Sequence, residues 1–250
     1  MRCVTPTAQD EAGALVALER VPCWDTEVQD LYAETGEPRA DVALQNRAEL
    51  AGFLAFMKAN SVRSYLEIGT WTGQTLCAVA GALDLDIVAC CDHGYAQQLG
   101  LPLHLPSGAR FLQADSDSNE FLRWREALGH IDMVLVDANH HYRALKKDVA
   151  LALSFPHRFL ALHDITGGNR HTRGVKRVWE ELDGEKLEIV RDNPDCPGAT
   201  PMGIGIRWGC ASATERRRGD VDRSPDLRGG THDPLDTAAP AGAHEPDRLR

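Results

Sequence analysis

The stretch from Ser64 to Val79, SYLEIGTWTGQTLCAV, most constrains what this chain can fold into. Its apolar start predicts a short strand, Gly69 predicts a tight turn, and the residues after Gly73 predict a helix. A turn of this kind directs free backbone N–H groups, and the positive end of the helix dipole, at a ligand above it. Glycine at both positions lets that ligand approach the backbone closely. The stretch therefore predicts an α/β protein with a ligand site at this turn.

The spacing of the glycines argues against two common phosphate sites. A dinucleotide fold needs G-x-G-x-x-G, whereas this turn reads Glu67-x-Gly69-x-x-x-Gly73, with Trp71 where a middle glycine might stand. A P-loop would need Gly-Lys-Ser/Thr at its end, and none follows. An acid two positions before Gly69 suits a cationic ligand better than a diphosphate. The turn resembles the first motif of the class I S-adenosylmethionine-dependent methyltransferases, although an ordinary strand–helix turn would also produce it.

Strand and helix patterns alternate along the chain from Asp41 onward. A helix over Asp41–Lys58 precedes the central strand, and runs such as MVLV and FLAL predict strands buried on both faces. We therefore expect an α/β, Rossmann-like, doubly wound sheet of seven strands, mostly parallel, with helices on both faces. The expected domains are an N-terminal cap with helices over 1–40, the S-adenosylmethionine-dependent methyltransferase domain over 41–210 and a disordered tail over 211–250, where large apolar residues are almost absent.

Charge and cysteine usage exclude several classes of protein. The formal net charge of −10 disfavours nucleic acid and anionic membrane as partners. No apolar run approaches the roughly 20 residues that a membrane span needs, and the first residues lack a signal-peptide pattern. The seven cysteines show no C-x-x-C spacing, which favours reduced thiols in the cytoplasm. The N-terminal cap and the helix over Asp41–Lys58 offer a surface for a homodimer.

Acidic residues stand at the carboxyl ends of successive predicted strands, where open α/β sheets bind their ligands. For S-adenosylmethionine, Asp92 would accept hydrogen bonds from the ribose hydroxyls and Asp115 from the adenine amino group. Glu67 and Gly69 would lie beside the methionine ammonium. Each acid alone could instead be a helix cap or a solubilising charge. The remaining predicted cofactor-binding residues are Thr70, Trp71, Gly73, Ser116 and Asp137.

The segment around the fourth strand, IDMVLVDANHHYRALKKDVALAL followed by FLALHDI, carries a second and more specific resemblance. It is similar to small-molecule O-methyltransferases that include macrolide-sugar O-methyltransferases and cephalosporin-hydroxylase-like proteins. Their pattern is D-G-x-H-x-Y, a helix with K-x-D, and H-D or E-D closing the fifth strand. The residues that match are Asp137, His140, Tyr142, Lys147, Asp148, His163 and Asp164, while Ala138 departs from the usual glycine. The resemblance implies methylation of a hydroxyl on a small molecule such as a sugar or secondary metabolite.

Two routes for removing the hydroxyl proton remain open in the sequence. In the first, His140, His141 or His163 is the general base, with Asp137 among the catalytic residues. In the second, Asp137 and Asp164, with His163 or Asn139 as a third ligand, hold Mg²⁺ or a similar ion that binds the substrate oxygen. The metal-using relatives often carry E-D where this chain has His163-Asp164. The alternative functions are a hydroxylase-associated or nicotinamide-dependent enzyme on the same scaffold, and a partner protein that binds cofactor without catalysis.

Overall fold

The computed structural model of this chain describes residues 3–36 and 39–209, so the tail expected over 211–250 lies outside the described residues. Within them, seven strands form one sheet in the order β3-β2-β1-β4-β5-β7-β6. The strands are β1 Ser64–Ile68, β2 Ile87–Asp92, β3 Arg110–Gln113, β4 Ile131–Val136, β5 His157–His163, β6 Glu185–Ile189 and β7 Ile204–Trp208. The helices are α1 Ala8–Ala17, α2 Thr26–Thr35, α3 Arg47–Ala59, α4 Gln74–Ala82, α5 Tyr95–Gln98, α6 Asn119–Leu128, α7 Tyr142–Ser154 and α8 Arg173–Glu181.

The strand pairing confirms the expected doubly wound sheet. Strands β3, β2, β1, β4 and β5 are mutually parallel, while β7 runs antiparallel to both β5 and β6. The chain starts at β1 and adds β2 and β3 toward one edge of the sheet. It then returns to β4 on the other side of β1 and adds the remaining strands toward the opposite edge. The carboxyl ends of β1 and β4 therefore flank the switch point, where sheets of this kind place their ligand.

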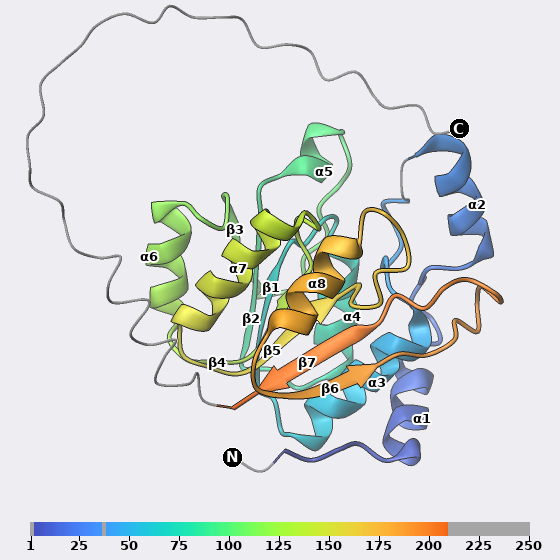
Figure 1. The fold of residues 1–250 in the computed structure, drawn as a ribbon, viewed down its shortest axis with the longest axis horizontal. Coiled ribbons are helices and arrows are strands. Elements are labelled where there is room, and N and C mark those ends of the chain that lie inside the picture. The colour runs from blue at the N-terminus through green and yellow to red at the C-terminus, as the bar shows by residue number, and fades with distance from the viewer. Residues whose placement is uncertain (1–2, 37–38, 210–250) are drawn as a thin grey trace, which may run out of the picture.

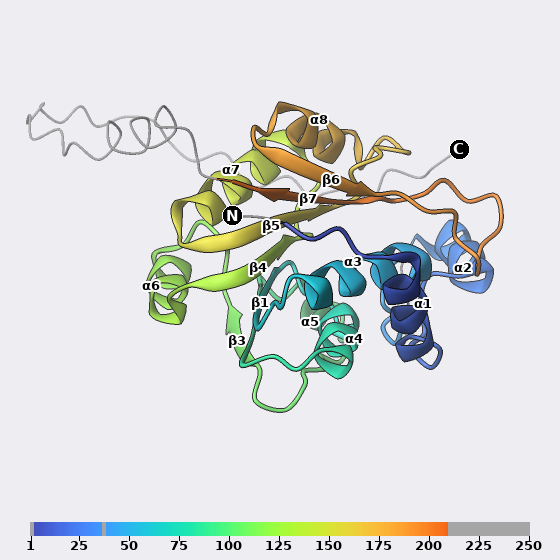
Figure 2. The same cartoon turned by 90° about the horizontal axis from the view of Figure 1, so that it is seen from below.

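Helices cover both faces of the sheet and close two hydrophobic cores (Figures 1 and 2). One core lies under α3 and α4 and contains Tyr65, Met133 and Phe159. The other core lies under α6, α7 and α8 and contains the strand residues adjacent in sequence to those of the first core, such as Leu66 and Val134. This alternation follows from the two-residue period of a strand. Glu67 and His163 have the parity of the first set, so both side chains leave the sheet toward the α3 and α4 face.

The N-terminal elements differ from the sequence-based expectations. The helix expected over Asp41–Lys58 is α3, which begins only at Arg47, because Asn46 adopts an extended backbone and its side chain accepts a hydrogen bond from Ala48 N. The N-terminal cap expected over 1–40 contains helix α2, which Asp25 caps by accepting from Val28 N. Among the described residues, no helix is both long and apolar enough to span a membrane.

Candidate active site at the carboxyl ends of the strands

A cavity of about 480 Å³ opens at the switch point, between the turn after β1 and the ends of β2, β3 and β4. Six predicted site residues are among the described residues that line it: Gly69, Trp71, Asp92, Asp115, Ser116 and Asp137. The other six, Glu67, Thr70, Gly73, His140, His163 and Asp164, are not among its lining residues. A larger hollow of about 800 Å³ follows α2, but it is open and is lined by N-terminal residues alone, without any strand end. The cavity at the switch point is therefore the candidate site.

The turn after β1 is held against the end of β4 by close backbone packing. Gly69 has a φ of +90°, and a Cβ on it would lie 2.2 Å from the Asp137 carbonyl oxygen. Only glycine fits this contact. Trp71 follows with a φ of +52°, an unusual backbone for a residue with a side chain. Its indole Nε1 is buried without a hydrogen-bond partner among the described residues. Strain of this kind is concentrated at functional sites.

Asp92 has a structural role that the sequence did not indicate. Its Oδ2 accepts hydrogen bonds from Thr70 N and Trp71 N, both at 3.0 Å. Its Oδ1 accepts from Gly94 N at 2.7 Å. A carboxylate offers about four acceptor positions, so these three bonds leave little capacity for the two ribose hydroxyls. Asp92 therefore ties the glycine turn to the end of β2, and its contact with the ribose stays a prediction.

Glu67 lies beneath the turn, with only 2% of its surface exposed. Tyr65 Oη donates to its Oε2 at 2.7 Å. Burial raises the pKa of Glu67 to about 8, against the opposing effect of the Tyr65 hydrogen bond. Its predicted place beside the methionine ammonium stays a prediction.

Asp115 and Ser116 lie at the far side of the cavity, after β3. The cap of helix α6 is Ser118, whose hydroxyl accepts from Phe121 N, so Asp115 is not required for capping. Ser116 donates its hydroxyl to Asp148 on α7. The contact of Asp115 with adenine stays a prediction.

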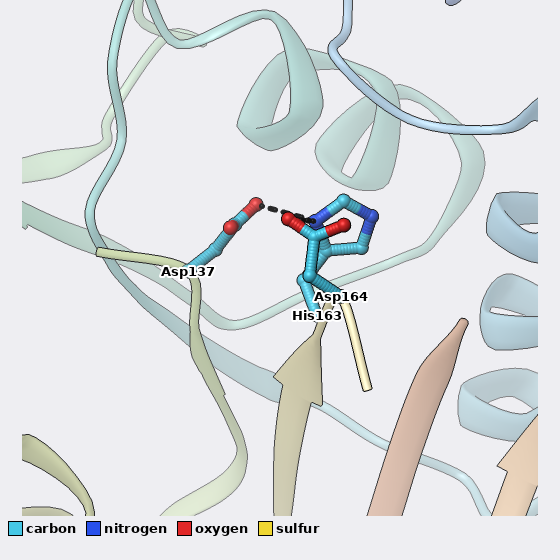
Figure 3. Close-up of side chains that lie close together, drawn as sticks. All are labelled: Asp137, His163 and Asp164. Atoms are coloured by element: carbon cyan, nitrogen blue, oxygen red, sulfur yellow. Dashed lines mark ion pairs between the residues drawn. The ribbon is translucent and has the colours of Figure 1, made fainter. Parts of the chain in front are cut away.

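Two carboxylates and two imidazoles form a compact cluster beside the cavity. Figure 3 shows the Asp137 carboxylate facing the ring of His163, with Asp164 next to it. The Nδ1 of His163 lies 3.3 Å from Asp137 Oδ2 and 3.7 Å from Asp164 Oδ2. The Nε2 of His140 lies 3.5 Å from Asp137 Oδ1 and 3.6 Å from Asp164 Oδ2. Each imidazole thus bridges the same two carboxylates.

Mutual pairing controls the charge of this cluster. Burial alone would lower the pKa of His163, but the carboxylates of Asp137 and Asp164 raise it to about 10. Burial likewise opposes ionisation of Asp137, yet the two histidines hold the pKa of Asp137 well below its usual range. Asp164 has a left-handed backbone with a φ of +61°, and burial raises its pKa. An imidazolium between two carboxylates therefore occupies the centre of the cluster at neutral pH.

The same atoms could hold a metal ion. One donor atom each from Asp137, His163 and Asp164 lies within 4.8 Å of the others. Two carboxylates and an imidazole are ligands for a divalent ion, and the ion would replace the shared proton. The donor set therefore fits a divalent metal, with His163 less typical for Mg²⁺ than a third oxygen ligand.

The two predicted histidines are not equally placed for proton transfer. His163 is 4% exposed, and its Nε2 is buried without a partner among the described residues. It contacts Asp137 rather than the cavity. The side chain of His140 is about one-third exposed. Asp137, which lines the cavity, and His140, which is partly exposed, are thus more accessible than His163.

Sequence reasoning missed two groups near the site. Gln45, from the segment before α3, donates its Nε2 to Asp137 Oδ2 at 3.1 Å. His93 and Tyr95, after β2, stack with ring centroids 5.9 Å apart, and Tyr95 packs on Trp71 at 5.7 Å. The stack borders the cavity. No sequence signal pointed to Gln45, whereas the aromatic residues after Asp92 were visible but had no motif around them.

Comparison with known proteins finds a family model that is similar to the central part of the chain. The model of a protein family described as a methyltransferase domain matches residues 66–165, from within β1 to just past β5. No protein with a curated description matches the chain.

Solved structures similar to this chain include O-methyltransferases. TomG from Streptomyces achromogenes, an O-methyltransferase of tomaymycin synthesis solved with SAM, is 15% identical, with a TM-score of 0.47 over 81% of this chain and 98% of its own. An O-methyltransferase from Bacillus cereus, solved with SAH, is 16% identical, with a TM-score of 0.47 over 82% and 99%. The mycinamycin-pathway methyltransferase MycE, solved with Mg and SAH, is 14% identical, with a TM-score of 0.43 over 63% and 47%.

The matched segment contains the glycine turn, Asp92, Asp115 and the cluster around Asp137. Residues 66–165 of this chain are thus similar to a methyltransferase domain, which agrees with the methyltransferase resemblance of the glycine turn and of the fourth-strand motif.

Proposed function

We propose that this protein is an S-adenosylmethionine-dependent O-methyltransferase that acts on a hydroxyl group of a small molecule. The observation that carries the proposal is the cavity at the switch point of a methyltransferase domain, with a glycine turn on one wall and acids on the others. The cavity of about 480 Å³ has the size of a small-molecule site. The acceptor class, and a place in antibiotic biosynthesis, rest on the resemblance of the fourth-strand motif alone.

In the proposed reaction, the acceptor oxygen attacks the methyl group in line with the sulfur, which leaves as a neutral thioether. Because the sulfonium is already activated, the protein must align the two partners and remove the hydroxyl proton. On the metal-free route His140, the partly exposed imidazole of the cluster, would take that proton, and the Asp137 carboxylate beside its Nε2 would orient the ring and stabilise the imidazolium. On the metal route, Asp137, His163 and Asp164 would hold an ion that lowers the pKa of the hydroxyl.

A ligand panel tests the proposal against its alternatives. S-adenosylmethionine and its demethylated product S-adenosylhomocysteine are expected to raise the Tm of the protein, whereas NAD is not. Stabilisation by NAD alone would assign the fold to a nicotinamide enzyme. Binding of S-adenosylmethionine without methyl transfer to any hydroxyl compound would favour a non-catalytic partner protein.

The Asp137→Asn variant tests the site itself. It removes the charge that both histidines pair with, so kcat is expected to fall by about 10²-fold or more, while S-adenosylhomocysteine still binds. Asp183→Asn is the matched control, because Asp183 is exposed and lies before β6, at the opposite end of the sheet. The homodimer and the cytoplasmic location stay predictions, which sedimentation and cell fractionation would check.

A further inference from the structure

Gln45 is a buried polar side chain for which the proposed chemistry has no role. Its exposed fraction is 1%. Its Nε2 donates to Asp137 Oδ2 at 3.1 Å, and the same oxygen lies 3.3 Å from His163 Nδ1. The Asp137 carboxylate is therefore held by His163, at the end of β5, and by Gln45, which lies 92 positions before Asp137 in the chain.

The backbone that carries Gln45 is fixed on its N-terminal side. Its carbonyl oxygen accepts from Trp24 N at 3.1 Å, and its own N–H donates to Ala43 O at 2.7 Å. Ala43 in turn forms an isolated parallel bridge with Cys23. These bonds attach the segment before α3 to the loop between α1 and α2.

The residues that follow Gln45 fix the same segment on its other side. Asn46 Nδ2 donates to Arg191 O at 2.7 Å, and Arg47 pairs with Asp195 at 2.5 Å. Both partners belong to the loop between β6 and β7. Because the backbone is held from two directions and the side chain is buried, the Gln45 amide has little freedom to leave Asp137.

The amide oxygen of Gln45 lowers the stability of the folded protein. Its Oε1 is buried and has no hydrogen-bond partner among the described residues. A buried polar atom left unpaired costs about 1–3 kcal/mol, and an apolar side chain of the same size would avoid that cost. The contact that distinguishes glutamine from such a side chain at this position is the bond to Asp137.

We propose that Gln45 is a positioning residue of the methyl-transfer site, whose Nε2 holds the Asp137 carboxylate in the orientation that faces His163. The part of this inference that concerns methyl transfer rests on the proposed function. The part that concerns the orientation of Asp137 does not. The N-terminal segment, which the family match over 66–165 does not include, thereby contributes a residue to the site.

The test compares Gln45→Met, which keeps the length of the side chain but loses both polar atoms, with Asn46→Ala. Asn46→Ala is the control. It removes the hydrogen bond to Arg191 and the cap of α3 in the same segment, and Asn46 makes neither of these bonds with Asp137. We expect Gln45→Met to lower kcat by about 10²-fold, as a displaced catalytic group does, with the Kd of S-adenosylhomocysteine unchanged within about 2-fold. Crystals of the variant should show the Asp137 carboxylate rotated away from His163.

Asn46→Ala should lower the Tm while kcat and the Asp137 orientation stay as in the wild type. If Gln45→Met does not fold, Gln45→Leu gives the same test, because it also removes the donor and leaves an apolar side chain of similar size. An unchanged Asp137 orientation in the folded variant overturns the positioning role. Equal losses of kcat in the Gln45 and Asn46 variants overturn it too. A wild-type protein that transfers no methyl group contradicts the proposed function instead, and the crystals still decide the orientation.

Discussion

The carboxylate of Asp92 and the backbone N–H of Trp71 form a hydrogen bond of 3.0 Å that joins the end of β2 to the glycine turn after β1. The same oxygen accepts from Thr70 N. Trp71 has a left-handed backbone, which is unfavourable unless its surroundings hold it. Asp92 thus stabilises the shape of the turn, whatever contact it also makes with a cofactor.

Asp92→Ala is therefore expected to weaken cofactor binding and stability together. The variant leaves three backbone N–H groups without their acceptor, a loss of about 1–3 kcal/mol for each group that stays buried. The Kd of S-adenosylhomocysteine should rise at least about 10-fold, which corresponds to about 1.4 kcal/mol. Calorimetric titration and thermal unfolding measure the two effects. An unchanged Kd would show that Asp92 does not contribute to the cofactor site.

Glu67 gives a pH dependence of stability with a defined sign. Burial raises its pKa from 4.5 to about 8, so between these values the folded protein holds a proton that the unfolded chain releases. Burial of protonated Glu67 therefore does not reduce the free energy of unfolding below about pH 4.5. The free energy of unfolding then falls as the pH rises from there through about 8, because the folded protein has to hold or lose this proton. Glu67→Gln keeps an acceptor for Tyr65 and does not titrate.

The Tm of Glu67→Gln should exceed that of the wild type by a few degrees at pH 9 and match it near pH 4.5, with both proteins free of cofactor. Thermal unfolding across this range measures the difference. The prediction is wrong if the difference between the two Tm values stays constant with pH.

Divalent ions should compete with the proton shared in the Asp137 cluster. If Asp137, His163 and Asp164 hold a metal ion, Mn²⁺ at about 100 times its Kd stabilises the protein by about 2.7 kcal/mol, or about 5–10 °C in Tm. The imidazole ligand should make the effect of Mn²⁺ larger than that of Mg²⁺. Asp164→Asn should abolish the stabilisation. A chelator that leaves methyl transfer intact would exclude the metal route.

Gly174 in α8 determines how closely this helix approaches the turn that carries His140. A Cβ on Gly174 would lie 2.2 Å from His140 O and 2.6 Å from Tyr142 N. Gly174→Ala must therefore displace the turn, and we expect kcat to fall at least about 10-fold, with a loss of stability of about 1–3 kcal/mol from overpacking. Gly13→Ala in α1 is the control, since nothing lies within 4 Å of its Cβ position, and wild-type kcat is expected. Equal behaviour of the two variants would contradict this role of Gly174.

Local patterns were enough to predict the strands and the ends at which the acids stand. Acids were expected at the carboxyl ends of the strands, and Asp137 directly follows β4, which ends at Val136. Helix α6 begins directly after Ser118, whose side chain caps it. These predictions depend on side-chain periodicity and capping, which act over a few residues. The start of α3 was wrong by six residues, because long-range contacts of Asn46 and Arg47 fix an extended segment before it.

The sequence by itself determined the alternating α/β fold, the glycine turn and the presence of acids and imidazoles at the carboxyl ends of the strands, because each of these follows from the order of neighbouring residues. Only the tertiary structure decided which partner each acid meets. Asp92 turns to the backbone of Trp71, Glu67 is buried under Tyr65, and Asp137 is shared by His140, His163 and Gln45. Hydrogen bonds and ion pairs act over about 3–4 Å, and residues far apart in the chain come that close only after the sheet and its helices have packed.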